Sequence, residues 1–253
     1  MSQPLTHNCL NCQEPLYHDF KLHYLWQFKK VLFPVLCLSC QQKFDCLEKI
    51  YQDKKNGCHL CGLLLSDDAT EDALTRKYHH DGQLICYHCK HWRTKYPIEL
   101  IRHQAIYPHN ELIQDWLSSF KDKGDIMLGY IMAEKLGKIY KQYKNYLWVV
   151  LPNSKELLEQ RQFHATGLLL DFADIPYTCP FNYVGDGKKQ TMKEGTERTE
   201  LIQPFEVNTE EIKEASILVF DDNYTTGTAI IHAKSALAKT YPEKIIKSIT
   251  ISR

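Results

Sequence analysis

The sequence has no excess of charge of either sign, no long apolar run and no secretory signal pattern. It contains 31 lysines and arginines and 31 aspartates and glutamates, so its net charge is zero. Any nucleic-acid contact must therefore come from a local patch. No stretch reaches the ~18 apolar residues of a membrane-spanning helix, and the start, MSQPLTHNC, lacks the basic-then-apolar pattern of a signal peptide. We expect a cytoplasmic protein without membrane insertion.

Cysteine, by contrast, is abundant, with ten residues in the chain. The cytoplasm keeps thiols reduced, so clustered cysteines there indicate metal ligation before disulfides. Eight of the ten form four C-x-x-C pairs, which are Cys9/Cys12, Cys37/Cys40, Cys58/Cys61 and Cys86/Cys89. Adding 49 to the residue numbers of the first two pairs gives the last two. The spacing is therefore duplicated.

This duplication predicts two tandem zinc modules. Two residues between cysteines allow a tight turn to aim both sulfurs at one tetrahedral ion. The repeat favours one ion on the first two pairs and another on the last two, and interleaved pairing, first turn with third, is the alternative. Four thiolates leave no coordination position for water, so both zinc sites are expected to be structural.

Two segments, from Tyr17 to Phe33 and from Lys90 to Tyr96, interleave aromatic residues with cations. Aromatic faces that stack on bases, beside cations that meet phosphates, are typical of single-stranded nucleic-acid binding. Alternatively, a module of about 40 residues uses its aromatics to pack around the metal. The candidates for phosphate contact are Lys29, Lys30, Arg93 and Lys95.

From about residue 100 the chain alternates short apolar runs with amphipathic stretches, which is typical of an α/β domain. Helical spacing predicts helices over 110–120 and 125–140, and apolar runs predict buried strands at 146–151, 216–220 and 247–251. The polar run 183–199 predicts a long loop. We therefore expect a zinc-binding region over residues 1–99 and an α/β domain over 100–253.

The stretch ILVFDDNYTTGTA, residues 217–229, carries the predicted chemistry. An apolar strand delivers Asp221 and Asp222, and a loop rich in hydroxyl groups then begins a helix near Thr228. Paired carboxylates can accept hydrogen bonds from vicinal ribose hydroxyls, while loop N–H groups and the helix N-terminus can hold a phosphate. A strand, a turn and a capped helix with no ligand is the alternative. The stretch resembles the phosphoribosyl pyrophosphate signature of type I phosphoribosyltransferases.

Cysteine turns ahead of that signature resemble the ComF family, whose members support DNA uptake in natural competence. The likeness covers nearly the whole chain. The run FKDKGD matches a K-x-K-G-D stretch of the family. The run RQFHA keeps Arg161 and Phe163 of an R-G-F-N-Q element but loses its glycine and asparagine. Asn223 and Ala229 also depart from the family's signature, which leaves open whether catalysis survives.

The resemblance implies a type I phosphoribosyltransferase-like fold, with a mostly parallel sheet and flanking helices. It implies that Asp221 and Asp222 bind the ribose hydroxyls, directly or through Mg²⁺. The residues implied for the 5′-phosphate are Thr225, Thr226, Gly227 and Thr228. The candidates for the pyrophosphate are Pro152, Asn153, Ser154, Lys155 and Arg161.

Three functions fit these features. The one we favour is a competence protein that supports DNA uptake and transformation and binds single-stranded DNA together with a phosphoribosyl ligand. A second is an active phosphoribosyltransferase that uses phosphoribosyl pyrophosphate, although the sequence identifies neither its acceptor nor a general base. A third is a ligand-sensing adaptor for a protein partner such as a DNA-uptake helicase.

Overall fold

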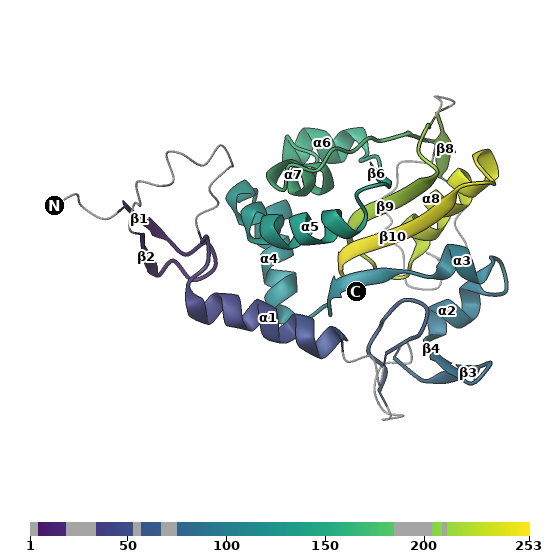
Figure 1. Cartoon of the computed structure of the whole chain (residues 1–253), viewed down its shortest axis with the longest axis horizontal. Coiled ribbons are helices and arrows are strands. Elements are labelled where there is room, and N and C mark those ends of the chain that lie inside the picture. Colours follow the sequence, from purple (N-terminus) through teal and green to yellow (C-terminus); the bar gives the residue numbers. More distant parts are fainter. Residues whose placement is uncertain (1–4, 19–33, 53–56, 67–74, 185–203, 209–211) are drawn as a thin grey trace.

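The computed structural model describes residues 5–18, 34–52, 57–66, 75–184, 204–208 and 212–253. Its centre is a sheet of four parallel strands in the order β5–β10–β9–β6 (Figure 1). The strands are β5 (Gln104–Tyr107), β6 (Leu147–Val150), β9 (Ser216–Asn223) and β10 (Ile245–Ser252). The three predicted strands are confirmed. The edge strand β5 was not predicted, because its apolar run, AIY, is only three residues long.

Helices cover both faces of this sheet. They are α4 (Glu111–Lys121), the 3-10 helix η3 (Ile126–Gly129), α5 (Tyr130–Gln142), α6 (Lys155–Arg161), α7 (Ala165–Phe172) and α8 (Thr228–Thr240). Alternate strand residues face opposite layers: Trp148 belongs to the same apolar layer as Trp116 of α4, whereas Val149 belongs to the same layer as Ile231 of α8. Burial of both faces explains why the strands are continuous apolar runs, and the predicted α/β class is confirmed.

The structure confirms the first of the two predicted helices and shifts the start of the second. The first is confirmed as α4, and the Asn110 side chain caps it by accepting a hydrogen bond from Ile113 N at 3.1 Å. The second begins five residues later than predicted, because η3 occupies its first turn. In this turn the Leu128 carbonyl accepts a hydrogen bond from the buried Trp116 indole at 3.0 Å. That tertiary contact is not visible in the apolar spacing.

A small antiparallel pair lies beside the sheet, formed by β7 (Phe181–Tyr183) and β8 (Phe205–Val207). The rings of Phe181 and Phe205 pack 5.6 Å apart between centroids and join the same apolar layer as α8. Most of the predicted loop over 183–199 lies outside the described residues.

The cysteine region consists of two modules. The first contains β1 (Leu5–Asn8), β2 (Pro15–His18) and α1 (Leu38–Gln52), and the second contains β3 (Tyr78–His80), β4 (Gln83–Ile85), α2 (Tyr87–Trp92) and α3 (Ile98–Ile101). Their turns repeat: Cys9 N donates to the Glu14 carbonyl and Cys58 N to the Leu63 carbonyl, both at 2.8 Å. The duplication seen in the sequence therefore extends to the backbone.

The two modules pack into opposite layers of the α/β domain (Figure 1). Phe44 of α1 contacts Tyr107 edge-on, with ring centroids 6.0 Å apart. Trp92 of α2 contacts His232 of α8 in the same way at 5.7 Å. The division at residues 99 and 100 stays a prediction. Within the described ranges no helix has the length and apolar character needed to cross a membrane.

Candidate functional site

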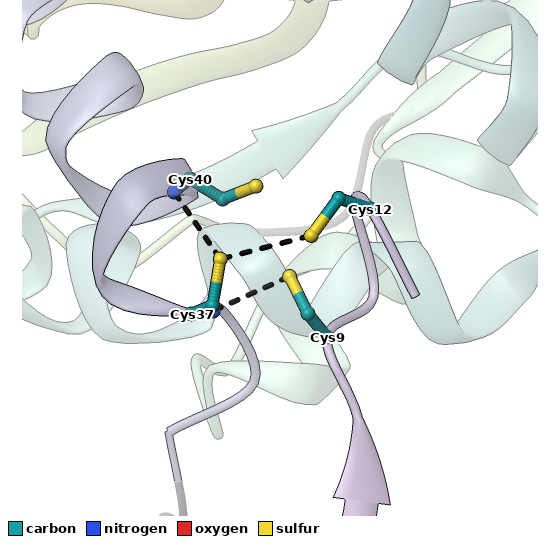
Figure 2. Close-up of side chains that lie close together, drawn as sticks. All are labelled: Cys9, Cys12, Cys37 and Cys40. Carbon is teal, nitrogen blue, oxygen red and sulfur yellow. Dashed lines mark hydrogen bonds between the residues drawn. The ribbon is translucent and has the colours of Figure 1, made fainter. Parts of the chain in front are cut away.

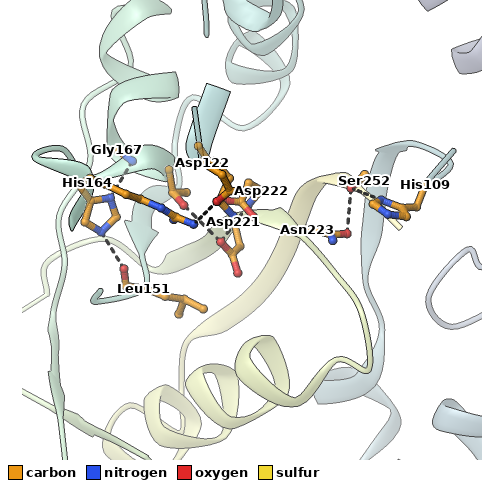
Figure 3. Close-up of polar contacts among 12 residues, drawn as sticks. His109, Asp122, Leu151, His164, Gly167, Asp221, Asp222, Asn223 and Ser252 are labelled. Carbon is orange, nitrogen blue, oxygen red and sulfur yellow. Dashed lines mark hydrogen bonds and ion pairs between the residues drawn. The ribbon is translucent and has the colours of Figure 1, made fainter. Parts of the chain in front are cut away.

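A cavity of about 710 Å³ opens at the carboxyl ends of β6 and β9, within the ~300–1,000 Å³ typical of ligand pockets. Parallel strands all end at the same edge of a sheet, so loops far apart in the sequence meet there. We call this cavity the acidic cleft. Its polar walls include Lys121, Asp122, Asn153, Arg161, Asp221 and Asp222. Figure 3 shows Asp122, Asp221 and Asp222 among them.

Asp221 and Asp222 stand at the end of β9, as predicted. Asp221 Oδ1 accepts hydrogen bonds from Asp222 N at 2.8 Å and from Thr166 Oγ1 at 3.3 Å. Asp222 is buried and forms an ion pair with Lys121, with Nζ and Oδ2 2.7 Å apart. Burial, together with the neighbouring negative charge of Asp222, raises the pKa of Asp221 to about 7. Asp221 therefore holds a proton more strongly than an ordinary aspartate does.

The opposite wall comes from the segment after β6. Ser154 caps α6 by accepting a hydrogen bond from Leu157 N at 3.2 Å. Arg161 extends toward the cleft and pairs with Asp122, with Nη2 and Oδ1 3.0 Å apart. The Asn153 amide nitrogen is buried, and no described residue accepts a hydrogen bond from it. An orphaned buried donor beside a cavity indicates a missing acceptor, such as a ligand oxygen.

The segment 224–228, which contains the loop between β9 and α8 and the first residue of α8, turns sharply at Gly227; we call it the loop 224–228. This residue has φ +87°, and a Cβ atom there would lie 2.2 Å from the Tyr224 hydroxyl oxygen. Thr225 is exposed, whereas Thr226 and Thr228 are buried and share a hydrogen bond of 2.7 Å between their hydroxyl groups. The helix begins at Thr228, as predicted. Phosphate binding by this loop stays a prediction.

The structure thus gathers most of the predicted residues. Pro152, Asn153, Ser154 and Arg161 line the same cleft as the two aspartates. Lys155 is exposed and lies outside that lining. The ion pair between Lys121 and Asp222 was not predicted, although the lysine stood in the FKDKGD run. Its pairing depends on the approach of α4 to the end of β9, for which the sequence carries no signal.

His109 was also missed as part of the site, and the capping role of His164 was not predicted. His109 lines the cleft beside Ser252, whose hydroxyl donates to Asn223 Oδ1 at 2.9 Å (Figure 3). His164 caps α7: its Nδ1 accepts from Gly167 N at 2.9 Å, and its Nε2 lies 2.9 Å from the Leu151 carbonyl. The histidine of the RQFHA run therefore has a local structural role.

The eight repeated cysteines form two clusters with sequential pairing. Cys9, Cys12, Cys37 and Cys40 make the first cluster (Figure 2), and Cys58, Cys61, Cys86 and Cys89 make the second. Within each cluster all four sulfurs lie within 4.8 Å of one another. The interleaved alternative does not occur. Each cluster could hold a zinc ion.

The sulfur spacing supports that fit. Four thiolates at about 2.3 Å from zinc stand roughly 3.8 Å apart in a regular tetrahedron. Cys12 and Cys37 Sγ are 3.7 Å apart, as are Cys61 and Cys86 Sγ. Backbone N–H groups also donate to sulfur, Cys37 N to Cys9 Sγ and Cys86 N to Cys58 Sγ, both at 3.3 Å. Such donors stabilise thiolate charge.

Of the DNA-binding candidates, Lys29 and Lys30 lie outside the described residues. Lys95 is exposed, and Arg93 is partly buried. Arg93 lines a shallow cavity of about 350 Å³ together with Lys90 and Tyr78. Lys90 Nζ stands 4.3 Å above the centre of the Tyr78 ring. A cation and an aromatic face are therefore adjacent on the second module.

These features define an α/β protein with an acidic pair at a strand end and two four-cysteine modules. This architecture is consistent with a phosphoribosyltransferase-like fold.

No family model matches the sequence. The chain is 29% identical over 255 residues to Competence protein ComFC of Bacillus subtilis (strain 168), covering 97% of this chain and 94% of that protein. It is also 29% identical over 153 residues to Competence protein ComFC of Streptococcus pneumoniae (strain ATCC BAA-255 / R6), covering 60% of this chain and 69% of that protein. The resemblance to the ComF family of competence proteins is confirmed.

Proposed function

We propose that this chain is a cytoplasmic competence protein that binds a ribose phosphate, such as phosphoribosyl pyrophosphate, in the acidic cleft and single-stranded DNA on the second cysteine module. One observation carries the proposal. Asp221 and Asp222 line the same cleft as Asn153, whose buried amide nitrogen has no hydrogen-bond acceptor among the described residues. Carboxylates suit ribose hydroxyls, and an amide donor suits a phosphate oxygen. The names of the two relatives support a role in competence.

The charges of the cleft fit a sugar diphosphate. Lys121 and Arg161 supply cations, and each is now paired with a carboxylate, Asp222 and Asp122 respectively. A diphosphate can compete for these cations because charge-assisted hydrogen bonds to its oxygens are strong. The carboxylates so released can accept from the sugar hydroxyls. The same side chains therefore link the walls of the cleft and are suited to bind the ligand.

A magnesium ion would also fit the cleft. Mg²⁺ usually binds one or two carboxylates together with substrate phosphates. Asp221 and Asp222 provide two carboxylates at the carboxyl end of β9, inside the cleft. When bound, it would neutralise part of the diphosphate charge. The raised pKa of Asp221 predicts that a cation must displace a proton there near neutral pH.

Calorimetric titration with phosphoribosyl pyrophosphate and Mg²⁺ tests the cleft. We expect saturable binding by the wild type and loss of at least tenfold in affinity for the double substitution Asp221→Ala, Asp222→Ala. Asp115→Asn, an exposed carboxylate of α4, is the matched control and should bind as the wild type does. Absence of any heat with the wild type would reject the proposal. Pyrophosphate release in the same samples separates an active transferase from a binding protein.

A further inference from the structure

The two cysteine clusters share their internal geometry but differ in their surroundings. In the first, Cys12 is exposed, and the side-chain donor is the neutral amide of Asn11, 3.3 Å from Cys40 Sγ. In the second, all four cysteines are buried. The side chain of Arg253, only 7% exposed, contacts this second cluster, with Nε 3.3 Å from Cys61 Sγ and Nη2 3.9 Å from Cys86 Sγ.

The same guanidinium also holds the loop 224–228. Arg253 Nη1 donates to the Thr225 carbonyl at 2.6 Å and approaches the Tyr224 carbonyl at 3.3 Å. Its carbon Cζ stands 4.9 Å from the centre of the Tyr224 ring. One buried cation therefore touches two cysteines and two loop carbonyls at once, which fixes its position from both sides.

A second contact runs from the same module to the next loop residue. Trp92 of α2, which follows Cys89, is fully buried, and its indole N–H donates to the Thr226 carbonyl at 2.8 Å. Three successive carbonyls, those of residues 224–226, are thus bound on the side of the second module.

The planarity of the peptide determines where the N–H groups of this loop point. In a trans peptide the N–H and the C=O point in opposite directions. Carbonyls 224–226 face the second module, so the N–H groups of residues 225–227 face away from it. No group of the described residues accepts a hydrogen bond from these three N–H groups. Successive unpartnered N–H groups ahead of a helix form a concave site for an anion.

Charge explains why a cation belongs at the second cluster. Four thiolates with one Zn²⁺ carry a net charge of about −2. Taking such a charge out of water is costly unless a counter-charge is buried with it. The guanidinium of Arg253 fulfils this role, because it contacts two of the four cysteines from within the core.

We propose that Arg253 is a positioning residue that couples the second cysteine cluster to the loop 224–228, so that the metal-loaded second cluster holds this loop ready for phosphate while the first cluster does not. The inference rests on the proposed ribose-phosphate site. It predicts that contacts at the second cluster affect the affinity for the sugar phosphate, whereas contacts at the first cluster do not, although the two modules repeat in sequence.

Arg253→Met tests the coupling, since it keeps an unbranched apolar stem and removes the guanidinium group with its charge and donors. Zinc release to a chelator should become at least tenfold faster for one of the two ions. Affinity for phosphoribosyl pyrophosphate should fall about tenfold. The matched control is Asn11→Ala, which removes the corresponding donor at the first cluster. It should speed release of one ion and leave the affinity unchanged.

A third readout does not depend on the ligand. Hydrogen exchange of the peptide that covers residues 221–229 should quicken in Arg253→Met and stay unchanged in Asn11→Ala. If the wild type does not bind the sugar phosphate, the proposed function fails, while zinc release and loop exchange still decide the coupling. Equal zinc release and equal loop exchange in Arg253→Met and the wild type would overturn it.

Trp92→Phe is a second variant that tests the coupling if Arg253→Met does not fold. It keeps an aromatic ring at this buried position and removes the donor to Thr226 together with part of the indole volume. We expect several-fold weaker ligand affinity and faster loop exchange at full zinc content. Unchanged loop exchange in this variant would also count against the coupling.

Discussion

At the scale of the residue, Asp221 combines burial with a neighbouring negative charge, and its pKa rises from 3.8 to about 7. A carboxyl group whose pKa is higher in the folded state binds more protons there than in the unfolded chain. The free energy of unfolding therefore falls as pH rises from about 4 to about 7. Relative to Asp221→Asn, which cannot ionise, we expect the wild type to lose about 3 kcal/mol between pH 4.5 and pH 8.

Urea unfolding of both proteins at the two pH values measures this difference. Comparison at each pH cancels the effect of pH on the cysteine clusters, which the two proteins share. Asp115→Asn removes an exposed carboxylate from α4 and serves as control. A gap between the wild type and Asp221→Asn that does not widen toward pH 8 would contradict the assignment.

At the scale of the element, the turn from β9 into α8 depends on one glycine. Gly227 has φ +87°, and an added Cβ would lie 2.2 Å from the Tyr224 hydroxyl oxygen. Gly227→Ala therefore combines backbone strain with overpacking. We expect it to lower the free energy of unfolding by about 2–4 kcal/mol, measured by urea denaturation.

Gly137→Ala in α5 is the matched control for that substitution. Apart from its chain neighbours and the backbone of its own helix, no atom of the described residues lies within 4 Å of the added Cβ, and the residue sits inside a helix. Alanine should stabilise it by about 0.5–1 kcal/mol. If both substitutions changed stability in the same direction, the argument from the turn geometry would fail.

At the scale of the whole molecule, zero net charge means that DNA affinity must be local. Arg93 and Lys95 lie on the second module, and Arg93 lines the same shallow cavity as the cation and aromatic pair Lys90 and Tyr78. Each phosphate contact contributes about −0.7 to the slope of log affinity against log salt on single strands. Charge reversal of Arg93 and Lys95 to glutamate should therefore flatten that slope by about 1.4.

Fluorescence anisotropy with a labelled single strand, titrated at several salt concentrations, measures the slope. The control makes the same charge change elsewhere, with Lys141 of α5 and the nearby Lys144, both exposed, replaced by glutamate. Equal slopes for both double variants would remove the Arg93 and Lys95 patch from the DNA surface.

The sequence by itself determined the features that depend on neighbours along the chain. The C-x-x-C turns, the apolar strands, the capped helix α4 and the order of two aspartates before a glycine turn are all local. Their spacing reports the geometry directly, because turns and periodic burial involve only a few consecutive residues. The repeat also favoured the sequential cysteine pairing that the structure has.

Only the tertiary structure decided how these parts meet. The pairing of Lys121 with Asp222 joins α4 to β9, and the contacts of Arg253 join the end of β10 to the second cluster and to the loop 224–228. The partners lie about a hundred or more residues apart in two of these contacts, so no local pattern records them. The packing of the two modules on opposite faces of the sheet has the same origin, because it depends on which buried surface each module covers.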